Sequence, residues 1–167
     1  MNGSYVFLLH LIGFGIVCTL QIVSWTLSIK AQREKDWNTK LNLLTTMNIF
    51  TFLSPIATAI LFLTGVGNIY NRYYSSPELW TAETWLVAKI ILVVVLVLLG
   101  NLVGPRLGKK KVMTIRKIIE QKQFENGEKQ LKSHNAKILV FLSIQSLLLL
   151  AILYLSVFGA GKHPGVF

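Results

Sequence analysis

The sequence predicts an all-α integral membrane protein, an antiparallel bundle of four transmembrane helices with both the N- and C-termini outside. Of its 167 residues, 53% are hydrophobic and only 14% are charged, whereas soluble domains carry about 25% charged residues. The apolar residues form four blocks, each close to the roughly 20 residues that cross a bilayer as a helix. These blocks are residues 5–29, 43–66, 84–103 and 138–158.

The basic residues predict the orientation. Four Lys or Arg lie in the connection 30–42 and ten in the connection 104–137, together 14 of the 17 in the chain. The positive-inside rule places both connections in the cytoplasm, so we expect a multi-pass protein of the bacterial inner membrane. The net charge of +10 is then a topology feature that favours anionic lipid, and nucleic acid is not an expected partner.

Each block has its own justification within a single membrane domain, 1–167. The first lacks the basic start and cleavage site of a signal peptide, so we interpret it as a retained helix. The second and third are mainly apolar, with short connections that favour sequential antiparallel neighbours. The fourth follows a longer polar segment, in which an amphipathic helix is expected to lie in the membrane interface. Asn126-Gly127 is expected to end that helix.

Two ionisable residues lie inside the predicted spans, and such residues mark functional sites by default. His10 lies about five residues into the first span and Lys89 about five residues into the third. Both spans enter from the outer side, so the two residues sit at one depth, roughly 7–9 Å from the helix ends. Each also lies on a helical stripe expected to face the bundle. The pair therefore predicts a site in the outer half.

Small and aromatic residues surround this level. Gly13 and Gly65 leave room for a flat ligand, and aromatic side chains flank it, namely Phe14, Phe62 and Trp85. Neutral imidazole is a good ligand for haem iron, so His10 is the candidate metal ligand. A desolvated lysine can act as a second ligand or a proton shuttle, so Lys89 is the candidate catalytic group. A lysine that snorkels to the head groups is the competing interpretation.

Two stretches resemble a known superfamily of small four-helix membrane proteins. Residues 8–15 (LLHLIGFG) resemble its K-x-x-H-x-x-G/A opening. Residues 84–107 (TWLVAKIILVVVLVLLGNLVGPRL) resemble its third helix, with a tryptophan, a lysine four residues later and an N…P-R-L exit. Its members include the HemJ-type protoporphyrinogen oxidases and the CopD-like copper-resistance proteins. The resemblance implies a haem b site that uses a first-helix histidine and a third-helix lysine, here His10 and Lys89.

Three functions remain open. The first is a haem-b protein that oxidises a porphyrinogen or passes electrons to a quinone. The second is an accessory or structural subunit that docks to other membrane subunits or to further copies of itself. The third is CopD-like transport of copper or another ion, to which His10 and His163 would contribute. No phosphate loop or nucleophile–base motif occurs, which disfavours hydrolytic and phosphoryl-transfer enzymes.

Overall fold

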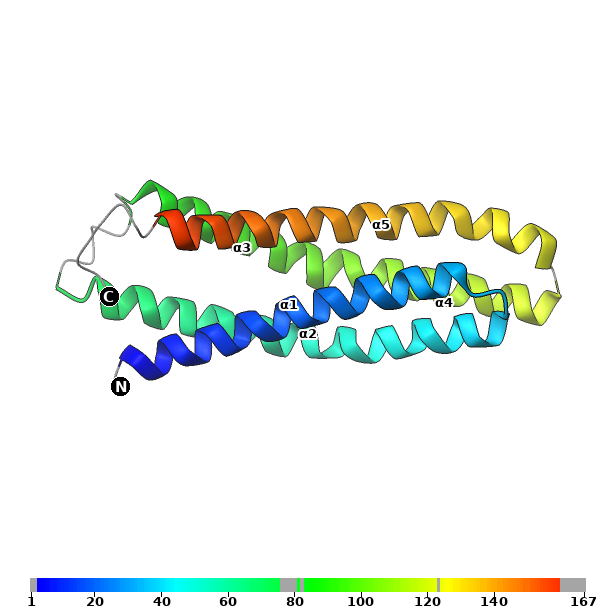
Figure 1. Ribbon diagram of the computed structural model, residues 1–167, viewed down its shortest axis with the longest axis horizontal. Coiled ribbons are helices and arrows are strands. Elements are labelled where there is room, and N and C mark those ends of the chain that lie inside the picture. The colour runs from blue at the N-terminus through cyan, green and yellow to red at the C-terminus, as the bar shows by residue number, and fades with distance from the viewer. Residues whose placement is uncertain (1–2, 76–80, 82, 123, 160–167) are drawn as a thin grey trace.

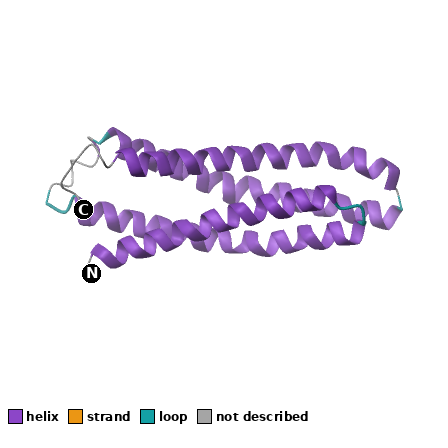
Figure 2. Ribbon diagram, viewed as in Figure 1, coloured by secondary structure: helices purple, strands orange, loops and turns teal. Residues whose placement is uncertain are grey.

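The computed structural model describes residues 3–75, 81, 83–122 and 124–159. Within these residues the chain forms four long helices (Figure 1; Figure 2). The elements in order are α1 (Gly3–Arg33), α2 (Trp37–Arg72), α3 (Thr84–Leu98), the π-helical turn η2 (Leu99–Val103), α4 (Gly104–Gln121), α5 (Phe124–Tyr154) and the π-helical turn η3 (Leu155–Gly159). The third long helix consists of α3, η2 and α4, and the fourth consists of α5 and η3. All four are long and apolar enough to cross a membrane, which confirms the predicted fold class. The orientation of the termini stays a prediction.

The helices extend well beyond the predicted spans. The connection expected at 30–42 shortens to residues 34–36, because α1 ends at Arg33 and α2 begins at Trp37. Asp36 caps α2: its carboxylate accepts a hydrogen bond from the Thr39 backbone N–H over 2.7 Å. Interactions with the Thr39 hydroxyl and N–H hold the pKa of Asp36 below its usual value. The Asp36 cap thus stabilises the short turn between α1 and α2.

The segment expected as the connection 104–137 is helical. As expected, it contains an amphipathic helix, α4, but α4 continues α3 through η2 and does not lie apart from the bundle. Its apolar face is buried on other helices, not free for the interface, since Val112, Ile115 and Ile118 are each at most 9% exposed. The helix ends at Lys122, which has a positive φ of 52°, and Asn126-Gly127 lies inside α5. Packing against the neighbouring helices explains why this polar segment stays helical.

The bundle has two ends of different character. We call the end that holds the start of α1, the end of α2 and the start of α3 the open end, and the opposite end the closed end. At the closed end α4 packs against both α2 and α5, and side chains from all four helices form one buried cluster: Ala31, Leu44, Met47, Val112, Ile115, Ile118 and Leu131. At the open end α1 follows α2 while α3 follows α5, and the two pairs diverge (Figure 1).

The outward face suits a lipid environment. Large apolar side chains such as Ile22, Phe52 and Leu147 are at least 65% exposed, an arrangement that is stable when lipid covers them. Threonine hydroxyls on this face donate hydrogen bonds to backbone carbonyls of their own helix. Thr19 donates to the Gly15 carbonyl and Thr26 to the Ile22 carbonyl, each over 2.9 Å. Such internal bonds satisfy polar groups where water is absent. The chain is therefore a multi-pass membrane protein.

Candidate functional site

The divergence of the helix pairs leaves a cavity of about 1340 Å³ along the bundle interior. It extends from Arg72 at the open end to Met47 and Gly108 near the closed end. Its walls are mainly aliphatic and aromatic, with a few polar side chains on different helices, among them Gln21, Ser24, Ser54, Thr58, Gln145 and Ser156. A largely apolar cavity with few polar groups is the usual form of a binding site.

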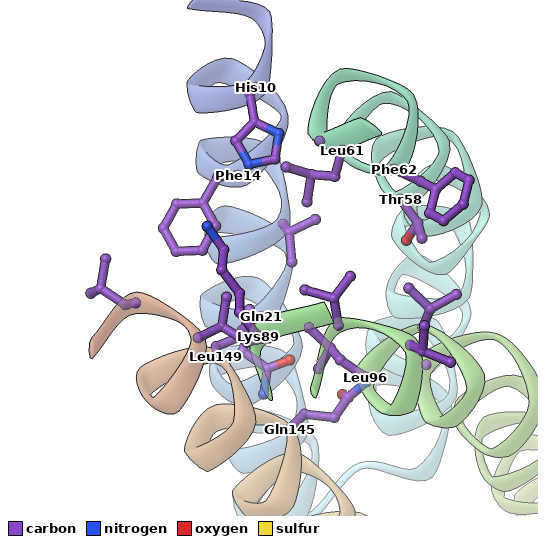
Figure 3. A pocket seen from close by; sticks show the side chains of 18 of the residues that line it. His10, Phe14, Gln21, Thr58, Leu61, Phe62, Lys89, Leu96, Gln145 and Leu149 are labelled. Carbon is purple, nitrogen blue, oxygen red and sulfur yellow. The ribbon is translucent and has the colours of Figure 1, made fainter. Parts of the chain in front are cut away.

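His10 and Lys89 both line this cavity, although they are 79 positions apart in the sequence. Figure 3 shows the Lys89 side chain extending toward Phe14 and the level of His10. The charge of Lys89 acts on the imidazole of His10, so the two groups are electrostatic neighbours. Helices α1 and α3 themselves face each other across the cavity, because α1 packs on α2 and α3 packs on α5. The two side chains thus face one cavity from helices that do not pack closely on each other.

The remaining predicted site residues divide into two groups. Phe14, Phe62, Gly65 and Trp85 line the cavity with His10, and Phe62 is also 55% exposed on the outer face. Gly13 is not among the lining residues. A Cβ atom there would lie 3.2 Å from both Ile60 and Leu61, so Gly13 instead lets α1 approach α2.

The hydrogen bonds of His10 determine which ring nitrogen is free. Nδ1 lies 2.9 Å from the Thr64 hydroxyl oxygen. That hydroxyl donates its own proton to the Ile60 carbonyl over 2.6 Å, so toward His10 it can only accept. Nδ1 must then carry the proton, and the Leu61 carbonyl is a further acceptor for the ring. The lone pair of Nε2 is left available, as in histidines that bind metals.

Polar and aromatic side chains line the rim of the cavity at the open end. Arg72 forms a salt bridge with Glu83, with 3.6 Å between Nη2 and Oε1, and its guanidinium lies 5.4 Å from the ring centres of both Tyr73 and Trp85. Burial and the neighbouring Glu83 carboxylate raise the pKa of Tyr73 to about 12, so its phenol stays neutral. The rim therefore ties the end of α2 to the start of α3.

Sequence reasoning missed Arg72 and Met47 as cavity residues. Arg72 was assigned to a polar connection, but α2 continues to it, and Gly65, Asn68, Ile69 and Arg72 recur at helical spacing along the lining. That spacing could have identified it. Met47 gave no such sign, because one methionine in an apolar block resembles ordinary core. His163 lies outside the described residues.

Ser146 is an interhelical hydrogen-bond partner. Its hydroxyl accepts hydrogen bonds from Gln21 Nε2 over 3.1 Å and from Trp25 Nε1 over 3.0 Å. These bonds join α1 to α5 midway along the bundle. Among the described residues no group of three or more His, Cys, Asp or Glu side chains is placed to hold a metal ion.

The comparisons agree with this architecture. The family model described as copper resistance protein D matches residues 44–158, which run from within α2 to within η3. The match includes Lys89 and most of the cavity lining, and it does not extend over α1 and His10. Comparison with curated proteins and with solved structures found no match.

Proposed function

Because the chain belongs to the copper resistance protein D (CopD) family, we propose that it carries copper ions across the membrane, with His10 as the first ligand in the cavity. Support comes from the His10 imidazole, whose Nδ1–H is donated to Thr64 and whose Nε2 is left to bind. Imidazole is a common ligand for copper. A fixed tautomer and ring orientation also strengthen metal binding by histidine.

The cavity offers a second soft ligand near its other end. Met47 lines it close to Gly108, and thioether sulfur favours Cu(I). Between His10 and Met47 lie the oxygen-bearing side chains of Gln21, Ser54 and Thr58. Transport requires sites that bind a cation and release it again. Separated ligands of this kind meet that need better than a closed cluster.

Lys89 limits how tightly copper is held. Its ammonium lies in the same cavity and acts on His10, so it repels a cation bound at Nε2. The repulsion shortens the residence of copper at His10 and favours movement along the cavity. In this proposal Lys89 is a tuning group, and its substitution by Met would strengthen copper retention while slowing release.

Copper uptake into proteoliposomes that contain the full chain tests the proposal. We expect His10→Ala to lower the uptake rate at least tenfold and Met47→Leu to lower it several-fold, because each loses a ligand. Matched controls are His134→Ala and Met113→Leu, whose side chains do not line the cavity. Unchanged uptake in folded His10→Ala protein would contradict the proposal.

A second candidate, haem b binding, is favoured by the size of the cavity. About 1340 Å³ far exceeds what a copper ion occupies, and pockets for cofactors measure roughly 300–1,000 Å³. His10 and Lys89 are the residues that would hold the haem, and the flanking aromatic rings would pack on it. Haem would supply redox chemistry for a porphyrinogen or quinone substrate, as the resemblance to HemJ-type proteins implies.

The visible spectrum of the purified protein separates the two candidates. If haem b binds, a Soret band is expected, which His10→Ala abolishes and Lys89→Ala shifts or weakens. Absence of the band in protein purified from haem-replete cells would reject haem binding and leave copper transport in place.

A further inference from the structure

A buried lysine lies beyond the deep end of the cavity. Lys111 on α4 is only 1% exposed, and its Nζ has no hydrogen-bond partner in the part of the chain that the structure describes. It is one of the largest fully enclosed side chains there. An ammonium ion withdrawn from water without a counter-charge costs several kcal/mol. Either the amine is neutral, or a group other than the described residues balances its charge.

The register of the helices identifies what surrounds Lys111. Gly104 of α4 packs against Phe141 of α5, and Gly127 of α5 packs against Ile118 of α4. Lys111 is midway between positions 104 and 118, and His134 is midway between 127 and 141, so the two residues lie at one level. Their electrostatic interaction agrees with this placement, and Lys110 and Lys137 act on the same histidine.

A second lysine approaches Lys111 from α2. Lys40 is 6% exposed, its Nζ lies 4.4 Å from the ring centre of Trp37, and its charge acts on Lys111. None of the described carboxylates forms a salt bridge with either lysine, and the described ion pair, Arg72–Glu83, lies at the open end. The level thus gathers positive charge that no described carboxylate pairs with.

Helix α1 adds an unpartnered hydroxyl. His10 lies opposite Thr64, so Ser28, eighteen positions further along α1, lies level with Thr46 on the antiparallel α2. Gly108 lies opposite Asn48, which in the same way places Lys111 level with Thr45. Ser28 is fully buried, and its Oγ has no partner among the described residues. Ser28 and Lys111 thus lie at one level of the closed end.

We propose that Lys111, Lys40 and Ser28 bind a small inorganic anion of the chloride class at the closed end. One monovalent anion would offset one of the two buried ammonium charges and accept hydrogen bonds from both the Lys111 ammonium and the Ser28 hydroxyl. Deprotonation of Lys111 would remove its own charge but leave the buried Lys40 ammonium without a counter-charge.

Thermal unfolding of the full chain in detergent tests this anion site. At constant ionic strength and pH 7.5, replacing sodium gluconate by 0.2 M sodium chloride should raise Tm by about 4 °C, because a ligand of the native state stabilises it by mass action. Lys111→Met should abolish the shift, since it removes both the charge and the donor. Lys110→Met, a change at the exposed neighbouring position, should keep it.

Direct binding of radioactive chloride provides a second measurement. Wild-type protein and Lys110→Met should bind about one chloride per chain, Ser28→Ala should bind it several-fold more weakly, and Lys111→Met should not bind it. If Lys111→Met does not fold, the weakened binding of Ser28→Ala decides the question. Wild-type protein that neither binds chloride nor shifts in Tm would overturn the proposal, as would a shift that persists in Lys111→Met. No copper is present, so the outcome is separate from that of the transport proposal.

Discussion

The open and closed halves of the bundle use the same four helices in opposite ways. In the closed half, side chains from every helix fill the interior, and Ala31 and Ile115 are fully buried. In the open half, the α1/α2 and α3/α5 pairs diverge around His10 and Lys89. Polar groups at functional sites tend to lower local stability, and packing elsewhere in the fold must compensate for that loss. The closed half therefore holds the bundle together, and the open half encloses the cavity in which copper binding is proposed.

The largest expected difference between the halves is their exposure to opposite sides of the membrane. In a Cys18→Ser background, which removes the single cysteine, Ser75→Cys at the open end should react with an impermeant thiol reagent added outside intact cells. Ser133→Cys at the closed end should not react, because the basic residues near it favour the cytoplasm. Labelling of position 133 but not of position 75 would reverse the predicted orientation.

A smaller but measurable difference concerns core stability. Ile115→Ala in the closed half should lower the free energy of unfolding by about 2–5 kcal/mol, because it leaves a cavity in a filled core. The matched change Ile90→Ala, in the wall of the existing cavity, should cost clearly less, since few contacts are lost. Denaturant unfolding in detergent measures both. Equal costs would mean that the open half is as tightly packed as the closed half.

The smallest expected difference concerns two helical glycines. A Cβ at Gly127 would lie 2.7 Å from Ile118 and 3.0 Å from Trp37, so Gly127→Ala should destabilise by about 1 kcal/mol, after its gain in helix propensity. A Cβ at Gly65 would meet the His10 ring at an ordinary 3.5 Å. Gly65→Ala should therefore be neutral or slightly stabilising. Shifts of Tm in the same direction for both variants would argue against the contrast.

The sequence predicted the elements of the candidate site better than their surroundings. Helical periodicity and membrane depth were enough to pair His10 with Lys89, because both quantities follow from residue counting along rigid helices. The Thr64 partner, which frees Nε2 of His10, depends on how two helices are rotated against each other. Residue counting places Thr64 near that level but does not determine this rotation.

By itself the sequence determined the four spans, because the length and hydropathy of an apolar block are local properties that the bilayer thickness constrains directly. Tertiary structure alone decided that residues 104–121 continue the third helix and bury their apolar face on the other helices. It also decided that Lys111 is enclosed and that the cavity lies between two diverging helix pairs. A lysine in a basic segment is normally solvated, so only the packing of four helices around it could reveal its burial.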